Sequence, residues 1–225
     1  YVMPISGGRD SRHLLLELLH AGHRPTRAVT ARHHQHVWGG DVPYAAKLCQ
    51  ELGVEHEALT PGPLIAEEWQ KNRVTGYNAD EHAWFAVVGR AMTEGGSHSY
   101  EGLNGSTAWI RDFYSPKMAR LSDEGRFEDL AQTLGRKEHG QPRYLSLLAP
   151  AVREDLGAER AVPRITAELE RHAHETEPYL AFRFWARAVG ELNLPSTVMV
   201  PDLPAVYTPF MDPDVTELAW SVPSQ

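Results

Sequence analysis

Strand-like and helix-like segments alternate over the first sixty residues, and this alternation restricts the fold more than any other feature of the sequence. Strands are predicted for the short segments at 1–5 (YVMPI), 26–31 (TRAVTA) and 54–59 (VEHEAL). Between them, apolar residues recur at helical spacing around 14–19 and over 41–53. Parallel strands need crossover connections of this kind, whereas a hairpin turn suffices for antiparallel strands. We therefore predict an α/β fold built on a parallel sheet.

The spacing of apolar residues becomes mostly helical after residue 64. A further short strand is predicted at 98–101, where it runs into a glycine-rich turn. A chain of this length favours one domain. We expect that domain to cover 1–225, with an α/β part at 1–115 and a largely helical part at 116–225.

The composition excludes several classes of function. The chain contains 22 Lys and Arg against 30 Asp and Glu, which gives a net charge of −8. Duplex nucleic-acid binders normally present a basic face, so we expect no nucleic-acid partner. No apolar run approaches the roughly 18 residues of a membrane span, and the first residues do not resemble a signal peptide. We expect a cytoplasmic protein with no membrane partner, whose single cysteine, Cys49, lies in the core.

A glycine-rich turn links the first strand to the first helix, with the sequence Ser6, Gly7, Gly8, Arg9, Asp10, Ser11. Such a turn directs backbone N–H groups and the positive end of the helix dipole toward one point, where anions bind. The glycines let the backbone approach the anion, and the serine hydroxyls add donors. Asp10 would repel a phosphate unless a divalent cation lies between them, so we expect Mg²⁺ at this residue. The alternative is a tight turn in which Asp10 only caps the helix.

This loop resembles the SGGxDS pyrophosphate-binding loop of the PP-loop ATP pyrophosphatase superfamily. Within that superfamily, Tyr207–Pro223 (YTPFMDPDVTELAWSVP) resembles a segment near the end of the synthetase domain of asparagine synthetases and their β-lactam synthetase relatives. The stretch DVPYAAKLCQELGVEH is similar to the second helix and third strand of the same domain. The resemblance covers most of the chain and implies a parallel sheet of the PP-loop type with a largely helical C-terminal part.

The resemblance also implies an activity, that of an ATP-dependent ligase that forms amides. A small-molecule or peptide carboxylate would be adenylated with release of pyrophosphate, and ammonia or an amine would then attack; the default substrate is aspartate, which would give asparagine. The diphosphate would be bound by Ser6, Gly7, Gly8, Arg9 and Ser11, and Mg²⁺ by Asp10. In this family the end of the second strand frames the adenine, which makes Val29 and Thr30 candidates for contact with the base.

The family's second acidic motif, GEGSDE, is altered in this sequence. The corresponding stretch reads YEGLNGSTAWIRDFY, in which Gly102 and Gly105 keep the turn but leucine, serine and threonine replace acidic residues. Of the nearest remaining carboxylates, Glu101 and Asp112, Glu101 is the better placed because it lies at the carboxyl end of a predicted strand. We therefore expect Asp10 and Glu101 to be the catalytic residues and Gly102 to contact the nucleotide.

Two features of the sequence leave a second function open. The acidic motif is altered, and the sequence contains neither the family's glutaminase domain nor the lysine that follows its PFLD segment. We expect no glutamine hydrolysis by this chain, so a separate or missing glutaminase domain would be the source of ammonia. The alternative function is a catalytically silent nucleotide-binding or assembly module.

Two clusters of polar residues each have two interpretations. Residues 33–36 (HHQH) follow the second strand, where they suit either a metal ion or a polar loop near the nucleotide base. Residues 78–84 (NADEHAW) suit either the capped start of a helix or a contact with substrate.

Overall fold

The computed structural model describes most of the chain, namely residues 1–32, 40–79, 82–94, 96–105, 115–138, 149–155, 157–200 and 202–222. The chain forms two compact units. The first comprises Tyr1–Ile110 and Trp185–Ala219, and the second Arg111–Phe184 and Trp220–Gln225. Among the described helices, none is both long and apolar enough to cross a membrane.

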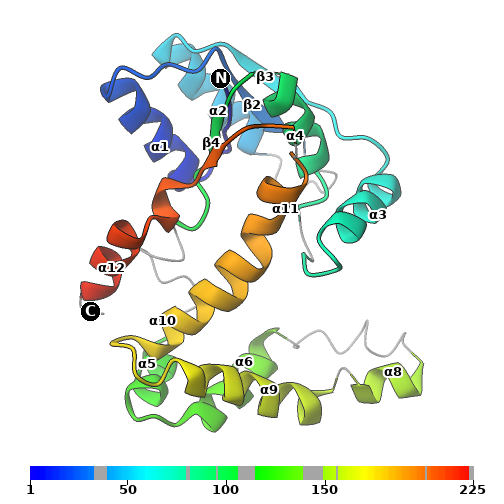
Figure 1. Ribbon diagram of the computed structural model, residues 1–225, viewed down its shortest axis with the longest axis vertical. Helices are drawn as coiled ribbons and strands as arrows, with labels where there is room; N and C mark the ends of the chain where they lie inside the picture. The colour runs from blue at the N-terminus through cyan, green and yellow to red at the C-terminus, as the bar shows by residue number, and fades with distance from the viewer. Residues whose placement is uncertain are drawn as a thin grey trace. The chain divides into compact units, whose positions relative to one another are not determined.

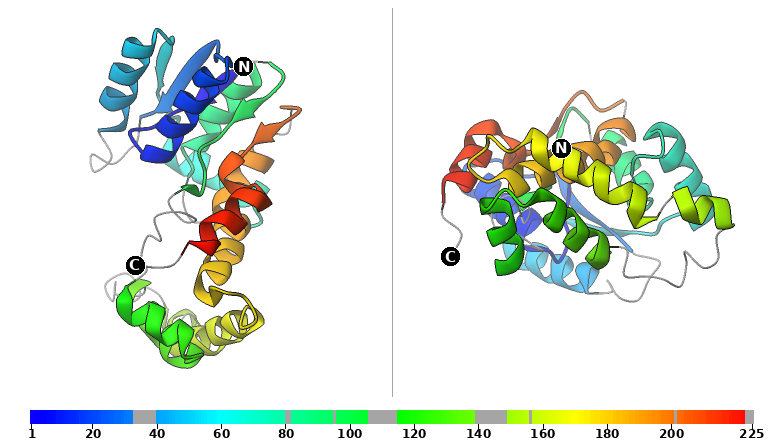
Figure 2. Two further views of the ribbon diagram at one scale, coloured as in Figure 1. Left: turned by 90° about the vertical axis from the view of Figure 1, so that its left-hand side faces the viewer. Right: turned by 90° about the horizontal axis from the view of Figure 1, so that it is seen from below.

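The first unit is built on a parallel sheet (Figure 1, Figure 2). The strand order in this sheet is β1-β2-β3. Its strands are β1 (Val2–Pro4), β2 (Arg27–Ala31) and β3 (His56–Leu59). The connecting helices are α1 (Arg9–His20) and α2 (Asp41–Leu52). The predicted α/β fold with a parallel sheet is therefore confirmed, and most of the described residues outside the strands are helical.

Strand alternation divides the sheet's side chains between two cores, because successive residues point to opposite faces. On one face, Met3 packs with residues of α1 and α2, among them Leu15 and Cys49. The thiol of Cys49 is fully buried, as expected from its place on the apolar stripe of α2. On the other face, Val29 packs against α4 (Phe85–Glu94) through residues such as Met92.

A second, two-stranded parallel sheet lies beside the first. It pairs β4 (Ser99–Tyr100) with β5 (Val206–Tyr207). The Ser99 hydroxyl donates a hydrogen bond of 2.7 Å to the Val2 carbonyl, which ties β4 to β1. The N–H of Glu101 donates to the Tyr207 carbonyl at 2.8 Å, so β5 holds the backbone where the glycine-rich turn begins. The first unit also contains α3 (Leu64–Val74), α11 (Asn193–Val198), the 3₁₀ helix η4 (Pro209–Met211) and most of α12 (Pro213–Ser221).

The second unit is helical. Its helices are α5 (Pro116–Asp123), α6 (Phe127–Glu138), α8 (Pro150–Asp155), α9 (Ala158–Arg171) and α10 (Pro178–Arg183). A core that includes Met118, Leu130 and Leu169 joins α5, α6 and α9. The chain then runs from α10 into α11 of the first unit through a π-helix, η3 (Phe184–Leu192).

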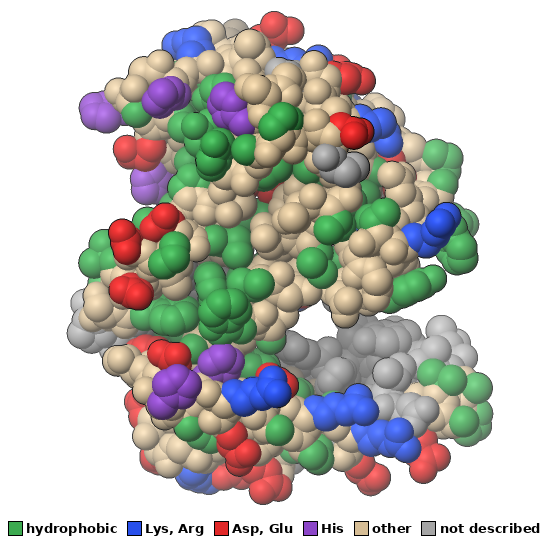
Figure 3. All heavy atoms as spheres, viewed as in Figure 1, with side chains coloured by type: hydrophobic (Ala, Val, Ile, Leu, Met, Phe, Trp, Pro, Cys, Tyr) green, Lys and Arg blue, Asp and Glu red, His purple; other side chains and the backbone are tan. Residues whose placement is uncertain are grey.

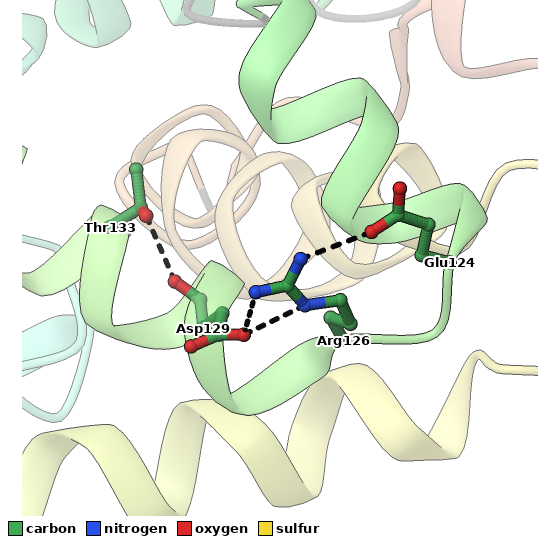
Figure 4. A network of polar contacts seen from close by, with 4 residues as sticks. All are labelled: Glu124, Arg126, Asp129 and Thr133. Atoms are coloured by element: carbon green, nitrogen blue, oxygen red, sulfur yellow. Dashed lines mark hydrogen bonds and ion pairs between the residues drawn. The ribbon is translucent and has the colours of Figure 1, made fainter.

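A polar network closes the turn between α5 and α6 (Figure 4). The Arg126 guanidinium donates to Asp129 Oδ2 at 2.6 and 2.9 Å and to Glu124 Oε2 at 3.2 Å. The Thr133 hydroxyl donates to the Asp129 carbonyl at 2.9 Å. Since Asp129 lies in the first turn of α6, its carboxylate also interacts favourably with the helix dipole.

Candidate functional site

The loop between β1 and α1 is held in its turn by two serine side chains. The N–H of Ser6 donates to Ser11 Oγ at 3.0 Å, and the N–H of Gly8 donates to Ser6 Oγ at 3.1 Å. The two hydroxyl oxygens are 3.1 Å apart. Gly8 is the N-cap of α1 and provides no side-chain acceptor for the first-turn amides of the helix. The hydroxyls predicted to bind an anion therefore also shape the loop.

Asp41, in the first turn of α2, contacts the same loop. The N–H of Gly7 donates to Asp41 Oδ1 at 2.7 Å, and a Cβ at position 7 would lie 2.8 Å from this oxygen. The Asp41 carboxylate thus accepts a hydrogen bond from the Gly7 amide, which was predicted to bind a phosphate. Nothing in the sequence around Gly7 indicates Asp41, because 34 residues separate the two. The position of Asp41 at the start of the predicted helix 41–53, which follows the second strand, was the one available signal, since the loops that follow parallel strands meet at one edge of a sheet.

The turn that follows β4 packs directly on the first turn of α1. A Cβ at Gly102 would lie 2.5 Å from the Ser11 nitrogen, and a Cβ at Gly105 would lie 2.6 Å from Asp10 Cγ. Real side chains essentially never approach so closely. Gly102 meets backbone atoms and therefore requires glycine, whereas Gly105 meets the side chain of Asp10, which would have to move. The structure therefore brings together the two stretches from which the sequence analysis took its candidate catalytic residues.

A cavity of about 190 Å³ lies beside this contact. It is lined by Pro4, Ile5, Ser6, Ser11, Val29, Ala31, His82, Trp84, Phe85, Val88, Glu101, Gly102, Leu103, Leu192, Pro195 and Ser196. Of the candidate residues, the lining includes Ser6, Ser11, Val29, Glu101 and Gly102. It does not include Gly7, Gly8, Arg9, Asp10 or Thr30.

Thr30 lies between two lining residues of β2, but its side chain makes its hydrogen bonds away from the cavity. Its hydroxyl donates to the Ile5 carbonyl at 2.7 Å and lies 2.9 Å from His56 Nε2. Strand alternation explains this difference, because Val29 and Ala31 share one face of the sheet and Thr30 points to the other.

Glu101 places a buried carboxyl group in the cavity wall. The residue is 3 % exposed. Burial raises the pKa of this carboxyl to about 8, and a side-chain hydrogen bond with Ser196 opposes the shift. One carboxyl oxygen, Oε1, is buried and has no hydrogen-bond partner among the described residues. The single hydroxyl proton of Ser196 has a second acceptor within reach, the Asn193 carbonyl oxygen at 3.0 Å.

Two residues of the candidate stretch 78–84 also line the cavity, namely His82 and Trp84. His82 has a φ of 73°, in the left-handed region that residues with side chains adopt infrequently. Its ring meets that of Trp84 edge-on, with centroids 5.4 Å apart. Strained backbone in a cavity wall is typical of functional sites. Asp80 and Glu81 lie outside the described residues, as do the histidines of 33–36 and Asp112.

The charges of the lining residues limit what the cavity can bind. The described lining contains one carboxyl group and one imidazole but no Lys or Arg. The end of η3 contributes Leu192 to the lining, and α11 contributes Pro195 and Ser196. Segments of π-helix are uncommon and often occur at functional sites.

Within the described residues, no group of three or more His, Cys, Asp or Glu side chains is arranged to hold a metal ion. A cation at Asp10 would therefore need ligands from a bound phosphate or from water, as Mg²⁺ commonly takes. Comparison with known proteins found no family model and no curated protein that matches the sequence.

Proposed function

We propose that the chain is an ATP-dependent, amide-forming ligase of the PP-loop type, which adenylates a carboxylate and releases pyrophosphate. The observation that carries this proposal is the packing of the turn at Gly102 and Gly105 on the loop that begins α1. The contact lies beyond the carboxyl ends of parallel strands, which is where open α/β sheets bind ligands. Glycine at position 102 permits this close backbone approach, which brings the two motifs to one place.

The loop residues would bind the diphosphate through their amides and through the hydroxyls of Ser6 and Ser11. Gly7 and Gly8 would allow a close approach, and the exposed Arg9 would add positive charge. Asp10 would hold Mg²⁺, which, when bound, neutralises charge on the departing pyrophosphate.

The nucleotide base and the second substrate would lie toward the ends of β2 and β4. Val29 and Thr30 would frame the adenine, and Gly102 would let the backbone approach the nucleotide. Glu101 would accept the proton that the attacking amine loses, since a carboxyl pKa near 8 is close to the pH at which such a base is effective. The substrates would be ATP, a small-molecule or peptide carboxylate, with aspartate as the default, and ammonia or an amine.

A catalytically silent nucleotide-binding or assembly module remains the second candidate. Leu103 lies in the cavity wall at a position where the family that the sequence resembles has an acidic side chain. Asp41 also occupies the Gly7 amide. Both features would weaken catalysis more than they would weaken the fold.

Carboxylate-dependent exchange of pyrophosphate into ATP tests the proposal. We expect exchange that requires Mg²⁺ and one member of a carboxylate panel that includes aspartate. The Asp10→Ala variant should lose more in turnover than in ATP affinity, because the metal is needed most when charge builds on the leaving group. Asp214→Ala is the matched control, since Asp214 also lies in the first turn of a helix, α12. Exchange without any carboxylate, or ATP binding without exchange, would contradict the ligase and favour the silent module.

A further inference from the structure

A second groove in the first unit lies on the segment that runs from β5 to α12, coloured orange to red in Figure 1. Its lining comes from Tyr100 of β4 and from residues between 206 and 215, and it shares no residue with the cavity at Glu101. Its volume of about 610 Å³ lies within the range of about 300–1,000 Å³ that is usual for ligand pockets. The groove is therefore large enough for a ligand of its own.

One wall of the groove is an aromatic surface. The rings of Tyr100 and Tyr207 stack, with centroids 5.2 Å apart and an angle of 29° between their planes. Tyr100 also meets the rings of Tyr1 and His98 edge-on, which fixes the stack in place. Tyr207, at the outer end of the stack, is 50 % exposed. A cation is attracted to an exposed ring of this kind, because the face of an aromatic ring is electronegative.

Asp212 adds a carboxylate to the same groove. Its Oδ1 accepts the Asp214 N–H at 3.0 Å, which orients the side chain at the start of α12. Asp212 makes no ion pair with a described residue, and the described lining contains no Lys, Arg or His. Every Asp, Glu, Lys or Arg in the sequence from 188 to 225 is an acid. The groove therefore attracts cationic ligands and repels anionic ones.

The combination of one flat ring and one carboxylate favours a guanidinium group over an ammonium group. A guanidinium is planar, so it can stack on a ring face and donate two parallel hydrogen bonds to a carboxylate. An ammonium is compact and strongly hydrated, and it has no flat face to offer. Pro209, Met211 and Val215, which also line the groove, suit the methylene stem of an arginine.

The backbone of β5 indicates that the arginine belongs to a peptide. β5 pairs with β4 through the carbonyls of Ala205 and Tyr207, which accept backbone N–H groups of the β4 segment. The N–H and C=O of Val206, which lies between them, therefore point to the opposite edge of β5. The described residues place no further strand at that edge. An extended peptide can add to such an edge through main-chain hydrogen bonds.

We propose that this groove binds an arginine residue of an extended peptide, with the guanidinium stacked on Tyr207 and paired with Asp212. Free arginine is the poorer ligand, because its own carboxylate would enter an acidic groove without a compensating cation among the described lining residues. The inference goes beyond the proposed ligase and does not depend on it, since no residue of the groove belongs to the loop at Ser6–Ser11 or to the cavity.

Calorimetric titration of the whole chain with short peptides tests this assignment. The probe is acetyl-Val-Arg-Val-amide, and in two counterparts the arginine is replaced by lysine or by citrulline, its neutral isostere. We expect the lysine peptide to bind about fivefold more weakly than the arginine peptide, and the citrulline peptide and free arginine at least about tenfold more weakly. Binding of none of the peptides, or equal binding of the arginine and citrulline peptides, would overturn the assignment. Free arginine that binds as tightly as the peptide would overturn the choice of a peptide.

Variants of the two recognition residues locate the binding in the groove. Asp212→Asn keeps an acceptor for the Asp214 N–H but loses the charge, so the affinity for the arginine peptide should fall about tenfold. Asp214→Asn is the matched control, because Asp214 is an exposed acid of the same turn that does not line the groove, and its effect should stay below about threefold. Equal losses in the two variants would show only a general attraction between charges and would overturn the pairing with Asp212.

Tyr207 is tested by a pair of variants that differ in the ring. Tyr207→Leu should lower the affinity about fivefold, whereas Tyr207→Phe keeps the aromatic face and should change it by less than about twofold. Unchanged affinity in Tyr207→Leu would overturn the stacking. These titrations contain no ATP, so their outcome and the outcome of the pyrophosphate-exchange assay are independent of each other.

Discussion

Glu101 is the residue whose ionisation is altered most clearly by its surroundings. Burial in the cavity wall favours the neutral carboxyl, with a pKa raised from 4.5 to about 8. Between these values the folded chain binds more protons at this site than the unfolded chain does. The linkage relation then requires stability to fall as pH rises through that interval and to level off above it.

The Glu101→Gln variant should lack this dependence. We expect its free energy of unfolding to exceed that of the wild type increasingly from about pH 5 to about pH 8, since the wild type alone must ionise a buried group. Each pKa unit corresponds to about 1.4 kcal/mol, so the gain above pH 8 should reach a few kcal/mol. Urea unfolding across this pH range measures it, with the exposed Glu55→Gln as control. Curves for wild type and variant that stay parallel would contradict the raised pKa.

Asp41 would compete with an anion for the Gly7 amide. Its carboxylate accepts the Gly7 N–H at 2.7 Å, so a phosphate that uses this amide must displace it. We expect Asp41→Ala to bind Mg²⁺-pyrophosphate about tenfold more tightly than the wild type, which corresponds to one charge-assisted hydrogen bond. Asp41→Asn keeps an acceptor without the charge and should fall between them. Calorimetric affinities that are unchanged or weaker in Asp41→Ala would show that Asp41 supports the loop and does not compete with the ligand.

At the scale of elements, the packing of the β4 turn on α1 gives a further prediction. The Cβ of Gly102→Ala would meet the Ser11 nitrogen and Cα at 2.5 and 2.6 Å, both of them backbone atoms. The turn must then shift, at an expected cost of about 1–3 kcal/mol in the free energy of unfolding and with weaker ATP binding. Gly157→Ala is the control, because its nearest contact would be 3.4 Å and only an N-cap preference changes. Thermal unfolding and calorimetry measure both effects, and equal losses in the two variants would refute the steric argument.

The orientation of α3 shows that the spacing of apolar residues does not decide which face of a helix is buried. This helix exposes Ile65 and Trp69 and buries Glu67 and Lys71. Figure 3 shows hydrophobic side chains at the surface on the side where Figure 1 labels α3. Glu67 Oε1 accepts the Gly62 N–H at 2.7 Å, and Lys71 Nζ lies 2.9 Å from Glu68 Oε2. Helix formation in this segment followed from the sequence. The face that turns inward did not, because its buried charged groups are stabilised by specific polar partners and not by the apolar pattern. One of these partners is distant in sequence: an Arg90 guanidinium nitrogen lies 3.8 Å from Glu67 Oε1.

At the scale of the whole molecule, the chain leaves the first unit after β4 and returns to it through α10 and η3. The sequence indicated a helical C-terminal part but contained no sign that 185–219 packs with the first unit. This return supplies β5, which holds the backbone of Glu101, and α11, which supplies Ser196 to the cavity wall. Both are long-range contacts between short segments, and local propensity does not specify such contacts.

The sequence by itself determined the parallel α/β core, the burial of Cys49 and the loop at Ser6–Ser11, because these depend on local periodicity and on glycine and serine in a short turn. Only the tertiary structure decided that Gly102 lies on Ser11, that Asp41 reaches Gly7, and that Glu101 is buried beside an apolar cavity. The physical reason is that each of these contacts joins residues distant along the chain. Their distances and their burial, and hence the pKa of Glu101, arise only when the strands are aligned and the loops meet at one edge of the sheet.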